Sequence, residues 1–424
     1  MFNAQRIILA ISCIICVGYL KHLWDNAHEN APLAPRKADQ NHGPSSISNT
    51  EHTAFPPTRQ QAIPSQTTDR CKSLRALGLD DVAIVLKTGS TEIYEKLPIH
   101  LATTFECVKD RLIYSDVKQN FARIPIRDAL ALISNRERIE LGQYHLLQEQ
   151  VRLGGDAAHM KGDKSWKLDK FKFLPMISDA YRTFEGRKKW YFFIEADTYV
   201  SLHNLVLWLQ KLDHTEPIYA GAQVLIGDTE FGHGGSGFLL SDTAAKAFME
   251  EYTARQEHWD TIIVSDCCGD KVMAEVLLAA DPPISLLRAF PLIQGETVTS
   301  LDWTETHWCK PAVTWHHVSA AEIDRHYQFE LHWHAQHGEK TPILFRDYYA
   351  AFVAPLIEEG NSTLDAWVGT SKGSMDFDHW SASYLFHKAQ ALSGLVQRLA
   401  VCAIGNIATL ALVLDALPVF RHVD

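Results

Sequence analysis

The sequence predicts an α/β fold built on a mostly parallel sheet with helices on both faces. Apolar strand patterns alternate along the chain with segments of helical spacing, an order typical of such folds. Residues 190–194 (WYFFI) are apolar throughout, as expected for a strand that is covered on both faces. This strand ends in two carboxylates, Glu195 and Asp197, at the position where open α/β sheets place their ligands.

Further strands are predicted from short apolar runs, and polar residues follow two of them. These strands cover residues 81–86, 111–114 and 218–222. Lys87, Thr88 and Gly89 follow the first strand, and Asp116 closely follows the second. Each of these residues alone is equally consistent with ordinary turn chemistry.

Several segments carry apolar residues at helical spacing. We expect helices at residues 93–105, 128–151 (with an irregular middle), 168–184, 201–212, 241–252 and 272–280. Ser241 is a candidate N-cap, and Pro282 and Pro283 stop the last of these helices. A later group of histidines matches no known metal-site spacing and predicts a solvated polar segment. Its members are His326, His332, His334 and His337.

A glycine-rich turn is predicted at Gly234, Gly235 and Gly237. Glycine permits positive φ angles and close approach of the backbone to a ligand. The spacing differs from that of Rossmann and Walker phosphate loops, and no lysine follows. The structural alternative is a simple turn before a helix.

The formal net charge of the 424-residue chain is −11, and no basic block is present, so we expect no nucleic-acid partner. Residues 7–24 contain an apolar run and predict a signal-anchor helix, with a cytosolic tail at 1–6. A cleaved signal peptide is the rival interpretation. Residues 25–70 hold six of the 17 prolines and predict a flexible stem.

The chain has eight cysteines, of which Cys13 and Cys16 lie in the predicted anchor. An even number of further cysteines suggests disulfides in an oxidising compartment. We expect Cys71 to pair with Cys107, and Cys309 to pair with one of the two adjacent cysteines, Cys267 or Cys268. A glycosylation sequon at Asn361 fits the same compartment.

Four of these features occur in an order that resembles glycosyltransferase family 31. They are the Glu195-Ala196-Asp197 motif, the Gly-Gly-Ser-Gly turn, the acidic helix start near Asp270, and His316 after an aromatic residue. The closest likenesses are the core 1 β-1,3-galactosyltransferases, the Fringe proteins and their fungal relatives. The resemblance runs from about residue 81 to 318 and implies a GT-A fold. One departure is that the family motif is often Asp-Asp-Asp.

The resemblance implies roles for individual residues. Asp197 and His316 would bind Mn²⁺ or another divalent cation. Asp270 would be the general base, with Asp266 as the alternative base and a charge complementing the helix dipole as the structural alternative. The donor-binding residues would be Lys87, Thr88, Gly89, Asp116, Glu195, Gly234 and Gly235.

The predicted function is that of a metal-dependent, inverting glycosyltransferase. It would move a hexose from a UDP-sugar to a glycan or glycoprotein acceptor, with a β-1,3 linkage implied by the resemblance alone. The GT-A domain would span residues 71–345, followed by an extension of unclear role at 346–424. We expect a single-pass type II protein of the Golgi or another secretory-pathway membrane, with the catalytic domain in the lumen. The alternative is a catalytically silent chaperone or glycan-binding relative, and homodimer formation is left open.

Overall fold

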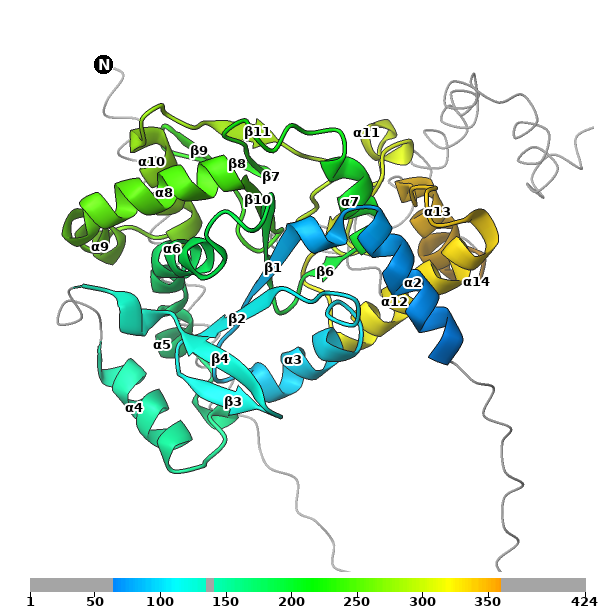
Figure 1. The fold of residues 1–424 in the computed structure, drawn as a ribbon. Coiled ribbons are helices and arrows are strands. Elements are labelled where there is room, and N and C mark those ends of the chain that lie inside the picture. The colour runs from blue at the N-terminus through cyan, green and yellow to red at the C-terminus, as the bar shows by residue number, and fades with distance from the viewer. Residues whose placement is uncertain (1–63, 135–140, 360–424) are drawn as a thin grey trace, which may run out of the picture. The chain divides into compact units, whose positions relative to one another are not determined.

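The fold is organised around a mixed β-sheet that runs through the computed structural model, which describes residues 64–134 and 141–359 (Figure 1). Eight strands form this sheet within the described residues, in the order β11-β7-β10-β5-β1-β2-β4-β3. They are β1 (Val82–Lys87), β2 (Arg111–Ser115), β3 (Gln119–Phe121), β4 (Ile124–Asp128), β5 (Trp190–Glu195), β7 (Tyr219–Gly221), β10 (Phe238–Ser241) and β11 (Leu286–Arg288). Two small antiparallel pairs accompany the sheet: β6 (Tyr199–Val200) with β12 (Thr314–Trp315), and β8 (Gln223–Ile226) with β9 (Thr229–Gly232).

The centre of the sheet is parallel, and strands nearer its edges include antiparallel pairs. β1 runs parallel to both β5 and β2, and β2 runs parallel to β4. β10 is antiparallel to β5 and β7, and β3 is antiparallel to β4. The predicted mostly parallel sheet is therefore correct for the centre, whereas the neighbouring strands make the whole sheet mixed.

Helices flank the sheet and cover both faces. The longer helices are α2 (Pro64–Ala76), α3 (Ile93–Ala102), α4 (Leu141–Arg152), α6 (Phe173–Phe184), α7 (Leu202–Leu209), α8 (Asp242–Ala254), α9 (Gln256–Ser265), α10 (Gly269–Ala279) and α12 (Ala320–His337). The shorter helices are α5 (Asp163–Trp166), α11 (Glu305–Trp308), α13 (Phe345–Tyr348) and α14 (Ala354–Glu359). As predicted, Ser241 caps α8, and its side chain accepts a hydrogen bond from the Ala244 backbone nitrogen.

Successive residues of the central strands enter two different apolar cores. On β1, Ala83 and Val85 pack with α6, α8 and α10, whereas Ile84 and Leu86 pack with α2, α3 and α7. Residue alternation along a strand explains this division, because side chains point to opposite faces in turn. β5 follows the same rule and is buried along almost its whole length, which accounts for its continuous apolar sequence.

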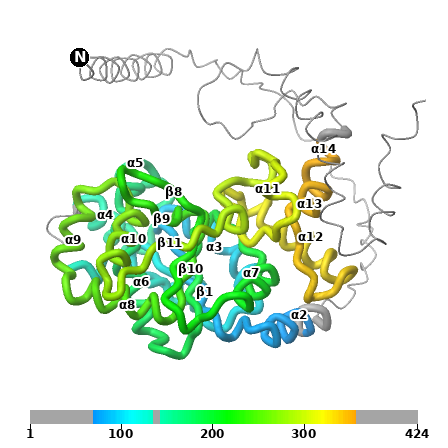
Figure 2. The backbone as a smooth tube through the Cα atoms, turned by 90° about the horizontal axis from the view of Figure 1, so that it is seen from above, coloured from blue at the N-terminus to red at the C-terminus, as the bar shows by residue number. Residues whose placement is uncertain are grey.

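A third core lies beside the small β6–β12 pair and contains α12 and α13. Trp315 and Phe345 are fully buried there, and Tyr199 contributes from β6. Figure 2 shows α12 and α13 on the side of the fold away from α8 and α10. These residues lie beyond the apolar patterns that the sequence analysis assigned to strands and helices.

The histidine segment differs from its prediction. Residues 320–337 form helix α12, with His326 and His334 buried and only His332 and His337 exposed. The helix places one of its faces against the third core, so two of the four histidines are packed inside. The helix was not predicted because all four histidines were treated as polar, solvated residues.

The helix expected at residues 128–151 is also different. Asp128 ends strand β4, and α4 begins only at Leu141, with residues 135–140 outside the described chain. Pro125 and Arg127 interrupt the apolar pattern of β4, which explains why this strand was not predicted. Helix α2 begins at Pro64, within the range 25–70 that was predicted as stem.

None of the helices in the described ranges has both the length and the hydropathy of a membrane span. The predicted anchor at residues 7–24 lies outside the described residues. The same is true of the Asn361 sequon and of most of the predicted 346–424 extension.

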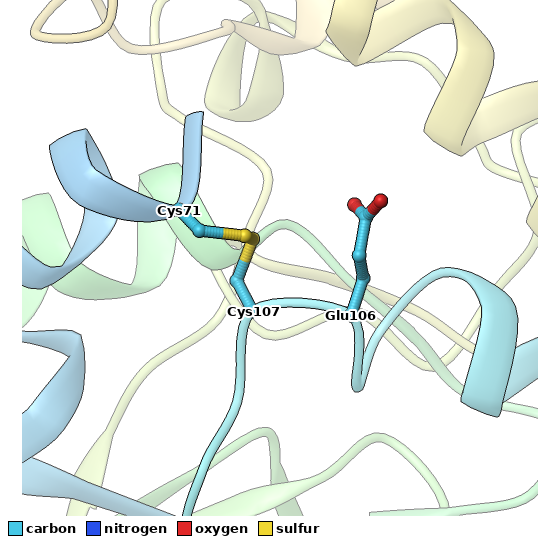
Figure 3. Close-up of side chains that lie close together, drawn as sticks. All are labelled: Cys71, Glu106 and Cys107. Atoms are coloured by element: carbon cyan, nitrogen blue, oxygen red, sulfur yellow. A yellow bond between two sulfur atoms is a disulfide. The ribbon is translucent and has the colours of Figure 1, made fainter. Parts of the chain in front are cut away.

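The predicted disulfide between Cys71 and Cys107 is confirmed, and it joins helix α2 to the loop before β2 (Figure 3). The second predicted pairing is wrong. Cys267 and Cys268 are bonded to each other, so neither can pair with Cys309, which is itself disulfide-bonded.

Removing the Cys71–Cys107 bond should destabilise the fold. The bond joins residues separated by 36 positions in the sequence. A disulfide typically stabilises the folded state by roughly 2–4 kcal/mol, because it restricts the unfolded chain. We expect a Cys71→Ala/Cys107→Ala variant to lose about this much free energy of unfolding in chemical denaturation. Alanine avoids burying a new hydroxyl at either site. An unfolding midpoint equal to that of the parent protein would contradict the expectation.

Candidate active site

The polar residues singled out at strand ends lie along one edge of the sheet. Lys87 and Glu195 are the last residues of β1 and β5 and are direct partners in the parallel register of these strands. Asp197 follows two residues later, between β5 and β6. Because parallel strands end at the same edge, their terminal side chains converge there.

The small β6–β12 pair brings His316 to the same place. Tyr199 pairs with Trp315, so the residue after β12 returns to the segment before β6. The backbone nitrogen of Val318 donates to the Asp197 carbonyl at 3.1 Å. His316 is 4% exposed, whereas His317 is exposed and has a φ of 59°. His316 is therefore the member of the pair that faces inward.

Asp197 lies between two positively polarised groups. The Lys96 Nζ is 3.1 Å from Oδ2, and the His316 Nε2 is 3.5 Å from Oδ1. Burial alone would raise the pKa of Asp197, but the His316 hydrogen bond and the Lys96 charge outweigh it and lower the pKa well below its usual value. Asp197 is thus an anion at neutral pH and can bind a cation.

Lys87 neutralises the neighbouring carboxylates. Its buried ammonium group bonds to Asp169 and lies 2.9 Å from Glu195 Oε1. It also lies 4.3 Å from the centre of the Phe173 ring. Burial would lower the pKa of Lys87, but the charges of Asp169 and Glu195 raise it above its usual value. An unpaired ammonium in this position would cost several kcal/mol, so the carboxylates hold Lys87 in place.

A second buried lysine, Lys172, contacts the residues that follow β1 and β2. Its Nζ donates to the Thr88 carbonyl at 2.8 Å and lies 3.5 Å from Asp116 Oδ2. The other Asp116 oxygen accepts from the Ser90 backbone nitrogen at 2.9 Å. Thr88, Gly89 and Asp116 are therefore parts of one ordered loop structure rather than separate surface turns.

The glycine turn packs directly against this group. Gly237 has a φ of 88°, which favours glycine. Gly235 needs its missing side chain for another reason, since an added Cβ would lie 2.3 Å from the His316 ring. The Gly235 carbonyl accepts from Thr198 Oγ1 at 2.7 Å, which links the turn to the acidic loop.

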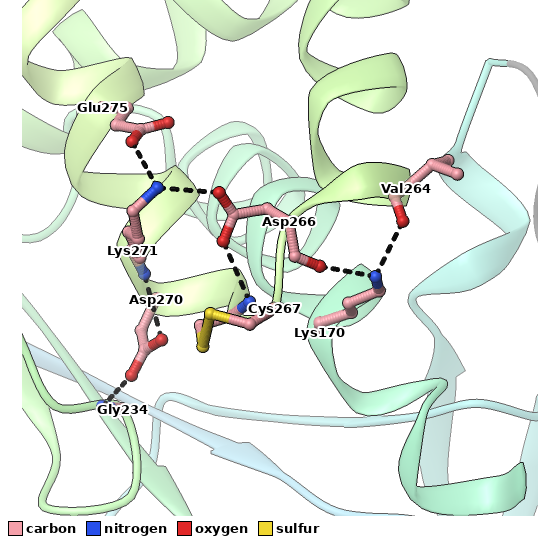
Figure 4. Close-up of a disulfide and its surroundings, with 9 residues drawn as sticks. Lys170, Gly234, Val264, Asp266, Cys267, Asp270, Lys271 and Glu275 are labelled. Atoms are coloured by element: carbon pink, nitrogen blue, oxygen red, sulfur yellow. Dashed lines mark hydrogen bonds and ion pairs between the residues drawn. A yellow bond between two sulfur atoms is a disulfide. The ribbon is translucent and has the colours of Figure 1, made fainter. Parts of the chain in front are cut away.

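The two candidate bases have different surroundings (Figure 4). Asp270 is 8% exposed and points to the glycine turn, where its Oδ2 accepts from the Gly234 nitrogen at 2.8 Å. Burial raises the pKa of Asp270. Asp266 instead accepts from Lys271 Nζ at 2.7 Å, and this bond outweighs burial and lowers its pKa. Only Asp270 of the two contacts the turn.

Four residues of this arrangement were not predicted as site residues from the sequence. They are Lys96, Asp169, Lys172 and His233. The lysines and Asp169 lie in helical segments that show no motif, and they reach the site only through the fold. His233 directly precedes the glycine turn, and its adjacency to that motif could have identified it. Its ring lies 5.4 Å from that of His316.

A surface cavity of about 420 Å³ lies elsewhere, at the beginning of β2. Its lining includes Lys109, Arg111, Arg123 and Arg127 and none of the residues predicted for the active site. We place the candidate site at the carboxyl ends of the strands because the charged side chains, the glycine turn and His316 meet there.

Comparison with known families gives a match to part of the chain. Residues 77–280 match the family model described as Fringe-like, a range that includes Asp116, Asp197, the glycine turn and Asp270. No curated protein matches the chain. Residues 77–280 of the chain are thus similar to the Fringe-like family, in agreement with the resemblance seen in the sequence.

Proposed function

We propose that this protein is a metal-dependent, inverting glycosyltransferase that moves a hexose from a UDP-sugar to a glycan or glycoprotein acceptor. Glycosyltransferase chemistry in the broad sense follows from the Fringe-like family. The UDP-sugar donor, the cation and a β-1,3 linkage are our proposals. The observation that carries the donor and the cation is the meeting of Asp197, His316 and Asp270 around one glycine turn, whereas the linkage rests on the family resemblance alone.

The residues at Asp197 fit a divalent cation. Two ligands of one octahedral ion lie roughly 3 Å apart, close to the 3.5 Å between Asp197 Oδ1 and His316 Nε2. The second ring nitrogen of His316 is buried without a hydrogen-bond partner among the described residues. When bound, the cation would supply Lewis-acid stabilisation of the departing diphosphate. Mn²⁺ suits this mixed oxygen and nitrogen set.

Two lysines and the backbone of the glycine turn would also contribute to donor binding. Lys96 lies beside Asp197 and Glu92, and Lys87 lies beside Glu195, so both ammonium groups are fixed at the strand edge. Fixed cations of this kind can bind phosphate oxygens. The backbone of Gly234 and Gly235 would allow a ligand to approach closely.

Asp270 would act as the general base for the acceptor hydroxyl. Its Oδ2 is held by the Gly234 nitrogen, which sets its direction relative to the turn. Its raised pKa makes it a stronger proton acceptor than an exposed carboxylate. The base must be ionised to work, so the rate should fall as the pH falls through this raised pKa.

The alternative function is that of a catalytically silent chaperone or glycan-binding protein. Glu195, where the family motif often has aspartate, favours this alternative because it is paired with Lys87. The enzyme is favoured by Asp197, His316 and Asp270, which a silent scaffold has no physical need to keep together.

Nucleotide binding should depend on a divalent cation. The phosphates of UDP would face Glu195 and Asp197, and this repulsion falls when a cation lies between them. We expect calorimetry to give clearly weaker UDP binding in EDTA than in Mn²⁺. Magnesium in place of manganese serves as the comparison for cation identity. Equal affinity with and without a cation would remove the metal from the proposal.

Two isosteric substitutions should give different signatures. Asp270→Asn cannot accept a proton, so turnover should fall roughly 10²–10⁴-fold while UDP binding is retained. Asp197→Asn should weaken both metal-dependent UDP binding and turnover. Asp266→Asn is the matched control and should change the rate little, because Asp266 is bound to Lys271. Parental turnover in Asp270→Asn, with loss in Asp266→Asn, would reverse the assignment. A parent protein without turnover on any UDP-sugar would support the silent alternative.

We also propose that the domain resides in the lumen of the Golgi or another secretory compartment, anchored by residues 7–24. The Cys71–Cys107 disulfide supports an oxidising compartment. We expect a glycan at Asn361, visible as a mobility shift on treatment with a glycosidase, and retention in the membrane after carbonate extraction. Asn361→Gln is the control for the shift. A soluble secreted product would instead favour a cleaved signal peptide.

A further inference from the structure

We propose a second, buried metal site, formed by His203 of α7 and by Glu330 and His334 of α12, that binds Zn²⁺ as a structural ion. One potential ligand atom from each residue lies within 4.8 Å of the others. All three side chains are buried, with residue exposures of 0%, 0% and 5%, respectively. None of them belongs to the candidate active site, and the proposal does not rest on the proposed function.

One polar side-chain atom of each of these three residues lacks an ordinary partner. His203 Nδ1, Glu330 Oε2 and His334 Nε2 are buried without a hydrogen-bond partner among the described residues. Leaving one such group unsatisfied costs roughly 1–3 kcal/mol, so three in one place call for a common ligand. A cation that accepts all three lone pairs would remove these costs together.

The other ring nitrogen of each histidine makes a hydrogen bond of the kind that metal-bound histidines usually make. His203 Nε2 bonds to the Glu339 carboxylate, and His334 Nδ1 lies 3.3 Å from the Gly338 carbonyl, to which it can donate. Each bond places the proton on the bonded nitrogen and leaves the other nitrogen with a free lone pair. Metal-bound histidines make this kind of second contact, which fixes the ring and its tautomer.

The carboxylate of the cluster is oriented in the same way. Glu330 Oε1 accepts from the Tyr348 hydroxyl at 3.0 Å, and the Tyr199 phenol also lies beside this carboxylate. The rings of His203 and His334 lie close together, with centroids 3.9 Å apart and a tilt of 34° between their planes.

The donor set selects the kind of ion. Two imidazoles and one carboxylate suit Zn²⁺, and a water molecule would complete its usual four-coordinate shell. Glu330 brings a carboxylate into a buried region, and a divalent cation would balance its negative charge. Glu330 and His334 are four residues apart and therefore share one face of α12. The ion would join this face to α7.

The other groups of potential ligands are already accounted for. The cysteines beside Glu106 and Asp266 are in disulfides. Asp197, His316 and His317 belong to the candidate active site. Among the described residues, the group of His203, Glu330 and His334 is therefore the one left for a separate ion.

The test is the metal content of the full-length protein, purified without chelator, incubated with Zn²⁺ and freed of excess ion. Elemental mass spectrometry should find about one tightly bound zinc ion per chain. Glu330→Gln and His334→Ala should each lose this ion. Glu330→Gln keeps the side-chain shape and the acceptor for Tyr348, so it remains informative if His334→Ala fails to fold.

Two controls separate this site from other sources of metal. His332→Ala changes an exposed histidine on the same helix and should keep the zinc. Asp197→Asn disables the proposed donor site and should also keep it. A strong chelator should lower the melting temperature of the parent protein, with recovery on adding Zn²⁺, and should leave Glu330→Gln unchanged. Parent protein without bound zinc, or equal zinc in parent and Glu330→Gln, would overturn the proposal.

Discussion

The parallel register between β1 and β5 is the constraint on which the candidate site depends. It places Lys87 directly opposite Glu195 at the end of two buried strands. The lysine is then fully enclosed, and its charge must be met by Glu195 and Asp169. A shift of one residue would turn these side chains to the other face and break both ion pairs. The apolar residues of β5 prevent that shift, because they fill two different cores.

Charge balance at the strand edge follows from this arrangement. Each acid of the site has a nearby cation or a backbone donor: Asp197 has Lys96, Asp116 has Lys172, and Asp270 has the Gly234 nitrogen. The low-dielectric surroundings strengthen such contacts. A site built in this way is ordered before any substrate arrives, so its groups need little rearrangement to meet a charged ligand.

Much of the sheet could be predicted from local patterns, and the site only in part. β1, β2, β5 and β7 are short apolar runs, and the acids and glycines next to them form visible motifs. β10 was missed because its apolar run follows the glycine turn directly and was taken as part of the approach to a helix. The lysines could not be found, since Lys96 and Lys172 lie in helical segments and meet their carboxylates only after the chain folds. The vicinal disulfide could not be found either, since the number of cysteines does not select their pairing.

The β6–β12 pair has a consequence for how the family domain is delimited. The Fringe-like match ends at residue 280, yet β12 and His316 lie beyond it and complete the surroundings of Asp197. Tyr199 and Trp315 also enter the third core with Phe345, so residues on both sides of the boundary share one apolar interior. A chain ended at 280 would leave Tyr199 and Val200 without their partner strand. The limit recognised by sequence similarity is therefore not a limit of independent folding, and the smallest autonomous unit must continue through α13.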